Sequence, residues 1–139
     1  TANLSSFFNS WFKTGDLGLI DKDGYIKITG RIKEIINKGG EKISPKEIDD
    51  VLQEIDAIEQ VVCFPFKSKK YGEEIGCAIV LKETMTISEK ELIEYASQNL
   101  AKFKIPDKFI FCNEIPKGPT GKLQRIGLSK TLGLDNEQL

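Results

Sequence analysis

Glycine and positive charge alternate in one stretch of this chain, Gly30–Ile48, and these residue types could bind an anion. Arg31 and Lys33 come first, and the pair Gly39 and Gly40 follows. Glycine allows backbone conformations that other residues avoid, and lysine and arginine offer charge to phosphate oxygens. The stretch therefore predicts a loop that moves and meets an anion. Two plainer interpretations stay open: the cations line a solvated strand edge, and the glycines form an ordinary turn.

A second glycine-rich loop, Gly118-Pro-Thr-Gly-Lys122, holds a lysine at its end. A Walker A phosphate loop is excluded, because two residues separate the glycines and Leu123 stands where a hydroxyl residue is required. A lysine can still act as a mobile point charge on phosphate oxygens. Upstream, Asp16 could accept hydrogen bonds from a sugar diol, or it could serve only as a turn residue or helix cap.

The residue counts restrict the chemistry further. The chain of 139 residues has no histidine, which excludes Ser-His-Asp and Cys-His catalysis and histidine metal sites. Its net charge of −1 argues against a nucleic-acid partner, and no apolar run approaches the roughly 18 residues of a membrane span. The three cysteines are widely spaced and form no CxxC pair, so we expect buried reduced thiols and neither zinc ligands nor disulfides. These features predict a soluble protein of a reducing compartment, the cytoplasm, with no metal site of its own.

Local patterns predict the elements that position the loops. Residues 17–20 and 25–29 are typical of a β-hairpin around a turn that ends in Asp-Gly. Residues 31–36 indicate a further short strand, and residues 37–40 a turn. The chain between Gly30 and Lys33 is therefore interpreted as a joint between two parts.

The second part predicts a mixed fold. Capping boxes begin two helices, at Ser44 and at Ser88, and apolar residues follow each at helical spacing. Three apolar, β-branched runs predict strands, at residues 60–66, 75–81 and 109–112. The predicted fold class is α+β, with an N-terminal β-hairpin segment followed by a compact domain in which helices pack on a three-stranded sheet.

Five motifs in this order closely resemble the C-terminal end of the adenylate-forming superfamily, which includes AMP-forming acyl-CoA synthetases, peptide-synthetase adenylation domains and luciferases. The resemblance covers nearly the whole chain, from Trp11 to Arg125. The motifs are Trp11-Phe-Lys-Thr-Gly-Asp16, Gly30-Arg-Ile-Lys33, Gly40-Glu-Lys-Ile-Ser-Pro-Lys-Glu-Ile48, Leu100-Ala-Lys-Phe-Lys-Ile-Pro106 and Ile115-Pro-Lys-Gly-Pro-Thr-Gly-Lys-Leu-Gln-Arg125.

The resemblance implies a ligase that works in two steps. Such enzymes join a carboxylate to ATP, releasing pyrophosphate, and then pass the acyl group from acyl-AMP to a thiol, usually that of coenzyme A. A large N-terminal domain holds the acid, the ATP phosphates and most contacts to Mg²⁺, and a small C-terminal domain swings between two orientations. By this resemblance, residues 1–32 are the end of the large domain and residues 33–139 are the mobile small domain, whose partners are its own N-terminal domain, the acid, ATP and CoA.

The resemblance also implies roles for single residues. Asp16 would bind the ribose hydroxyls of ATP or AMP, and Arg31 would contact the nucleotide nearby. Lys33 stands at the hinge position of the family. Lys122 would be the adenylation lysine, because that step needs positioned positive charge and no proton-transfer base.

A loop for the second step is implied as well. Gly39 and Gly40, with Lys42, would face the active site after rotation, near the pantetheine thiol. Two positions depart from many relatives, since Asn37 and Ile126 stand where basic residues are frequent.

The residues most resemble acyl-CoA or oxalate-CoA ligases, and the chain by itself is expected to be inactive or very weak. One alternative is an adenylation domain that loads a carrier protein. Another is a freestanding, non-catalytic remnant that acts as a binding module.

Overall fold

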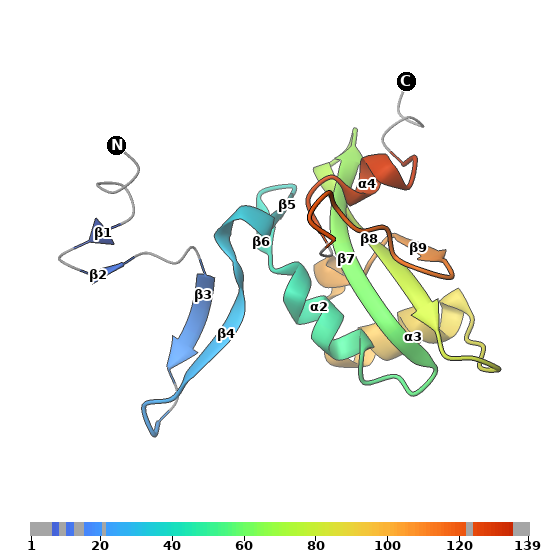
Figure 1. Ribbon diagram of the computed structural model, residues 1–139, viewed down its shortest axis with the longest axis horizontal. Helices are drawn as coiled ribbons and strands as arrows, with labels where there is room; N and C mark the ends of the chain where they lie inside the picture. Colours follow the sequence, from blue (N-terminus) through green and yellow to red (C-terminus); the bar gives the residue numbers. More distant parts are fainter. Residues whose placement is uncertain (1–6, 9–10, 13–15, 21, 122–123, 135–139) are drawn as a thin grey trace.

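The computed structural model describes residues 7–8, 11–12, 16–20, 22–121 and 124–134. Its first elements are two antiparallel pairs of strands. The short pair is β1 (Phe7–Phe8) with β2 (Trp11–Phe12), and the longer pair is β3 (Asp16–Ile20) with β4 (Ile26–Arg31). The β3–β4 pair confirms the predicted hairpin, and it extends away from the remaining elements (Figure 1).

The expected strand over residues 31–36 is wrong. Strand β4 ends at Arg31, opposite Asp16 at the start of β3, and the chain then turns into a short 3₁₀ helix, η1 (Ile32–Glu34). The amide of Ile35 donates to the carbonyl of Ile32 at 3.4 Å. The backbone after Arg31 thus satisfies a hydrogen bond locally.

The sheet of the second part has five strands and not the three that were expected. They are β5 (Ile36–Lys38), β6 (Glu41–Ile43), β7 (Ile58–Ser68), β8 (Gly72–Leu81) and β9 (Lys108–Phe111). Strands β7 and β8 form a long antiparallel hairpin, and β9 runs parallel to β8. The additional strands β5 and β6 each bury one isoleucine and are otherwise polar, so no apolar run indicated them, and residues 37–40 were expected only as a turn.

Helices cover both faces of this sheet, which confirms the α+β fold class. Helices α2 (Pro45–Leu52) and α3 (Glu89–Asn99) lie along one face, where Ile48, Leu52, Leu92 and Ala96 are fully buried (Figure 1). The short helix α4 (Leu128–Thr131) covers the other face with Leu128, against Phe64 and its neighbours. A second 3₁₀ helix, η2 (Lys102–Lys104), precedes β9. In the described part of the chain, no helix has the length and apolar character that crossing a membrane requires.

The two predicted helix starts have different outcomes. At α3 the hydroxyl of Ser88 accepts a hydrogen bond from the amide of Glu91 at 3.2 Å, as a capping box requires. At α2 Ser44 occupies the N-cap position and Pro45 follows it, but the Ser44 side chain makes no capping hydrogen bond. The helix start there is confirmed and its expected side-chain cap is wrong.

The expectation of three reduced cysteines is also wrong. Cys63 and Cys77 form a disulfide inside the core, and Cys112 is free. The register of the β7–β8 hairpin places Cys63 directly opposite Cys77, with their Cα atoms 4.2 Å apart. The pairing depends on strand register, which the spacing of 14 residues in the sequence does not reveal.

Candidate functional site

The diglycine turn is a two-residue hairpin connection between β5 and β6. Gly39 and Gly40 have φ angles of +57° and +94°, a combination that favours glycine at both positions of such a turn. The Gly39 amide donates to the carbonyl of Tyr71 at 2.9 Å, and the Gly40 amide donates to Oδ1 of Asn37 at 3.1 Å. Both amides are therefore hydrogen-bonded within the protein.

Acidic residues at the start of β8 hold this turn in place. Lys38 Nζ lies 2.8 Å from Glu74 Oε1, with 15% and 8% of the two side chains exposed. The same Glu74 oxygen accepts the amide of Ile75 at 3.0 Å, and Glu73 accepts the amide of Asn37 at 2.7 Å. The turn is therefore attached to β8 through the β5 residues that precede the glycines, Asn37 and Lys38.

A groove of about 440 Å³ opens beside the turn. Its walls carry the rings of Tyr71 and Phe103, each 37% exposed, and the ammonium groups of Lys38 and Lys102. Lys38 Nζ and Lys70 Nζ lie 5.2 and 5.0 Å from the centre of the Tyr71 ring. Aromatic faces next to ammonium groups suit a ligand with a flat base and phosphates.

Of the two glycines, Gly39 lines this groove and Gly40 does not. A Cβ on Gly39 would lie 3.2 Å from the Tyr71 ring, whereas a Cβ on Gly40 would meet nothing within 4 Å. Gly40 thus leaves open space at the tip of the turn. Lys42, which we expected in the same loop, is an exposed residue of β6 opposite Asn37 and does not line the groove.

Sequence reasoning missed Tyr71. It lies in the β7–β8 turn, 32 positions beyond Gly39, and the pairing of β5 with β8 brings it to the diglycine. Lys102 and Phe103 stood within one of the recognised motifs, but the motif did not indicate that they face the diglycine.

The two residues predicted to contact nucleotide are not among the described residues that line the groove beside the diglycine turn. Asp16 and Arg31 are direct partners across the β3–β4 hairpin, and Arg31 is exposed. A second groove, of about 410 Å³, is lined by Arg31, by the exposed hinge candidate Lys33, and by Gln124 and Arg125. The structure thus joins the nucleotide and hinge candidates to the segment that follows Lys122. Lys122 itself lies outside the described residues.

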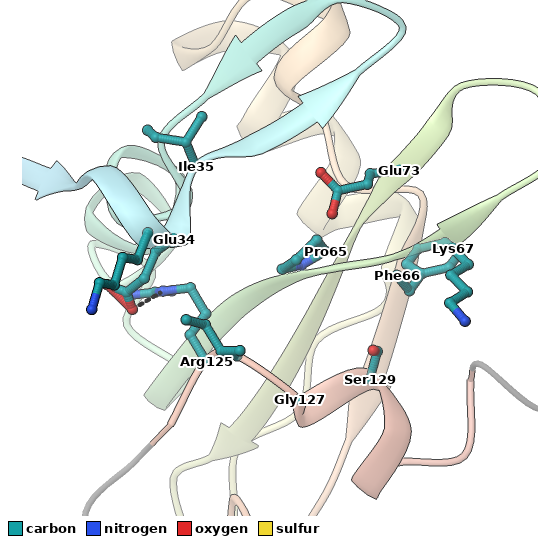
Figure 2. A pocket seen from close by; sticks show the side chains of 11 residues that line it. Glu34, Ile35, Pro65, Phe66, Lys67, Glu73, Arg125, Gly127 and Ser129 are labelled. Atoms are coloured by element: carbon teal, nitrogen blue, oxygen red, sulfur yellow. Dashed lines mark hydrogen bonds and ion pairs between the residues drawn. The ribbon is translucent and has the colours of Figure 1, made fainter.

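Arg125 makes three hydrogen bonds beside this groove. Its Nε lies 3.2 Å from Glu34 Oε2, and its Nη1 lies 2.7 Å from both Asp49 Oδ2 and the carbonyl oxygen of Cys63. Figure 2 shows its side chain directed at Glu34 beside a cavity of about 290 Å³. Sequence reasoning placed Arg125 at the end of a motif but assigned it no role.

Asp49 is the titratable group most affected by this arrangement. Its Oδ1 accepts the amide of Cys63 at 2.7 Å, while Oδ2 receives Arg125. Burial raises the pKa of Asp49 from 3.8 to about 6, although the guanidinium of Arg125 and the Cys63 amide act in the opposite direction. The carboxylate is therefore charged at neutral pH and is neutralised in mildly acidic solution.

Comparisons with known proteins agree with the motifs. A family model described as the AMP-binding enzyme C-terminal domain matches residues 47–122, more than half of the chain. The oxalate–CoA ligase of Arabidopsis thaliana is 46% identical over 124 residues, which are 89% of this chain and 24% of that protein. The long-chain-fatty-acid–CoA ligase of Mycobacterium tuberculosis is 40% identical over 127 residues, which are 91% of this chain and 25% of that protein.

A solved structure supports the same relationship. The o-succinylbenzoate CoA synthetase of Bacillus subtilis, in complex with its acyl-adenylate intermediate, matches with a TM-score of 0.80 and 37% identity, over 90% of this chain and 25% of that one. The resemblance to adenylate-forming enzymes is confirmed, and the chain spans about a quarter of the length of the relatives it matches. It belongs to the AMP-binding enzyme C-terminal domain family.

Proposed function

We propose that this chain acts as the C-terminal domain of an AMP-forming acyl-CoA ligase and supplies both the adenylation lysine and the loop for thioester formation. The observation that carries the proposal is the presence of two separate grooves, each with lysine or arginine side chains and one glutamate in its lining. One holds Arg31, Lys33 and Arg125, and the other holds Lys38 and Lys102 beside the diglycine turn. Two grooves suit two half-reactions, each presented in turn by rotation at a hinge.

The first half-reaction is adenylation. A carboxylate oxygen of the acid attacks the α-phosphorus of ATP, the bond from that phosphorus to the pyrophosphate oxygen breaks, and acyl-AMP and pyrophosphate form. In the proposal Lys122 neutralises the charge that develops between the carboxylate and the α-phosphate, while Arg31 and Asp16 hold the nucleotide. Residues 1–32 belong to the preceding large domain, which holds most of the contacts to Mg²⁺, and Lys33 is the pivot.

The second half-reaction is thioester formation. The sulfur of CoA attacks the acyl carbonyl, the bond to the AMP oxygen breaks, and the thiol proton is released. The groove beside Gly40 suits this substrate, because its aromatic walls fit the adenine ring and Lys102 fits a phosphate. The open space at Gly40 suits the narrow pantetheine arm.

The same groove favours CoA over the alternative acceptor, a carrier protein. A carrier presents phosphopantetheine without adenosine, so it has no base to place against Tyr71 and Phe103. The acid itself is left open, because relatives named for oxalate and for long-chain fatty acids match this chain at similar identity. With ATP and CoA as cosubstrates, a cytoplasmic location is part of the proposal.

The test uses the full-length ligase that contains this chain. Acid-dependent exchange of pyrophosphate with ATP measures adenylation, and a panel of acids identifies the substrate. Thioester formation is then compared with CoA and with a phosphopantetheinylated carrier protein as acceptors. If exchange proceeds but only the carrier protein is loaded, the acceptor is a carrier protein and not CoA. If no acid supports exchange, the ligase assignment is rejected.

A further inference from the structure

We propose that Arg125 is a positioning residue for adenylation, which fixes the loop carrying Lys122 to the small domain by bonding to Glu34, Asp49 and the Cys63 carbonyl at once. The inference rests on the function proposed above. It concerns Arg125, which touches neither of the two glycines nor the acceptor groove, and it adds a structural cause for the placement of Lys122.

The three acceptors of Arg125 come from three different elements. Glu34 lies in η1, Asp49 in α2 and Cys63 in β7. Only 14% of the Arg125 side chain is exposed, and the carboxylates of Glu34 and Asp49 are 21% and 15% exposed. The planar guanidinium can donate in several fixed directions, which a lysine ammonium on a flexible stem does not reproduce. The contact therefore orients the backbone at residue 125 relative to the sheet and to α2.

The position of Arg125 in the chain gives this contact its consequence. Arg125 follows Lys122 by three residues, so the two Cα atoms can be at most about 10 Å apart. On the other side of the loop, Gly118 lies against the side chain of Gln124, with no space for a Cβ between them. The amide of Gly121 also donates to the carbonyl of Gly118 at 2.9 Å. Residues 118–121 thus form a turn closed by a hydrogen bond, and Arg125 anchors the chain where its description resumes after residues 122–123.

Glu34 connects this loop to the hinge. It directly follows Lys33, so the bond between Arg125 and Glu34 joins the end of the loop to the small-domain side of the proposed pivot. Rotation at Lys33 would then carry Lys122 and the domain together. Without Arg125 the domain would still rotate, but the lysine would arrive with a less defined position.

A positioning role predicts unequal loss in the two half-reactions. The full-length ligase is assayed for pyrophosphate exchange and, separately, for CoA thioester formation from supplied acyl-AMP. Arg125→Met should lower exchange by about 10- to 100-fold, because a displacement of about 1 Å can cost 10²-fold. Thioester formation should change by less than a factor of about three. Arg125→Lys should recover part of the exchange activity, since it keeps the charge.

Two further variants keep the test sharp. Glu34→Gln weakens one bond of Arg125 at a partly exposed position and should give a smaller, equally selective loss of exchange. Lys46→Met breaks the exposed pair of Lys46 with Asp50 on the same helix α2, 2.7 Å long, and should leave both activities unchanged.

The outcomes separate this inference from the proposed function. Lys122→Ala, assayed beside these variants, must lose exchange for the ligase assignment itself to stand. If it does while Arg125→Met and Glu34→Gln keep full exchange, Arg125 does not position the loop. Equal loss of both half-reactions in Glu34→Gln would instead assign Arg125 and its partners a general structural role and overturn the inference.

Discussion

Lys38 Nζ and Glu74 Oε1 form an ion pair of 2.8 Å that attaches the diglycine turn to the first residues of β8. The pair is largely withdrawn from solvent, and Glu74 also accepts the Ile75 amide. Removing one partner of such a pair leaves the other charge poorly solvated, which costs more than the pair contributes. The position of the turn therefore depends on Glu74, which lies 36 positions beyond Lys38 in the chain.

Glu74→Gln should make this dependence measurable. We expect the free energy of unfolding of the chain to fall by about 3 kcal/mol, because Lys38 stays buried without a counter-charge. Urea unfolding checks this. The matched control is Asp56→Asn, which removes an exposed pair with Lys82 at 3.5 Å and should cost less than about 1 kcal/mol. Equal decreases in the free energy of unfolding of the two variants would mean that the buried pair contributes no more to stability than the exposed pair.

Lys122→Ala tests the adenylation lysine. In the full-length ligase, pyrophosphate exchange should fall by at least about 10²-fold, since one positioned charge in a transition state is worth that much. Formation of the CoA thioester from supplied acyl-AMP should continue, because Lys122 has no part in that step. Parallel loss of both half-reactions would remove the assignment.

Gly40→Leu should have the reverse effect. The side chain would fill the open space at the tip of the turn and would also strain a backbone at φ +94°, so thioester formation should fall while exchange continues. Gly24→Leu is the control for strain. Gly24 has φ +85°, equally open space, and a place in the β3–β4 turn away from the groove. Thioester formation that survives Gly40→Leu, or falls equally in both variants, would contradict the role of the loop.

Tyr71→Ala tests the nucleotide end of CoA. Loss of one aromatic face should raise the KM for CoA by about tenfold, the value of a single base stacked on a ring. The KM for pantetheine, which has no adenine, should not change. Tyr95→Ala serves as the control. Tyr95 lies on α3, its hydroxyl donates to Glu54 Oε2 at 2.9 Å, and it does not line the groove. A KM that rises equally for both thiols would place the adenine elsewhere.

The raised pKa of Asp49 predicts a pH dependence of stability. Between pH 3.8 and about 6 the folded chain holds a proton on Asp49 that the unfolded chain has lost. The free energy of unfolding should therefore decrease as the pH rises through this window, by at most about 3 kcal/mol. The groups that act on Asp49 are Arg125 and the Cys63 amide, which lower the pKa, and Asp50, which raises it.

Asp49→Asn should remove this contribution. Urea unfolding of the chain and of the variant at pH 4.5 and pH 7 isolates it, because the other titrating groups are common to both. We expect the unmodified chain to lose stability relative to Asp49→Asn between the two pH values. A difference that stays constant or has the opposite sign would mean that Arg125 holds the carboxylate charged throughout.

Local features of the sequence were sufficient for much of the fold. The hairpin before Arg31, the long strands β7 and β8 and the helix that begins after Ser88 depend on turn residues, alternating or continuous apolar runs and a capping box, which act over a few residues. Strands β5 and β6 were missed for the same reason. They are short and polar, and they are strands only because a buried isoleucine in each and the start of β8 give them partners.

The sequence by itself determined the family and the order of its motifs, because those depend on residue type and spacing along the chain. Tertiary structure decided which of those residues meet. Arg125 reaches Glu34 across 91 positions, Tyr71 meets Gly39 where β5 pairs with β8, and Cys63 faces Cys77 through strand register. Such contacts follow from how strands pair and which faces helices cover, and the energies that decide this come from packing of the whole core and not from any local pattern.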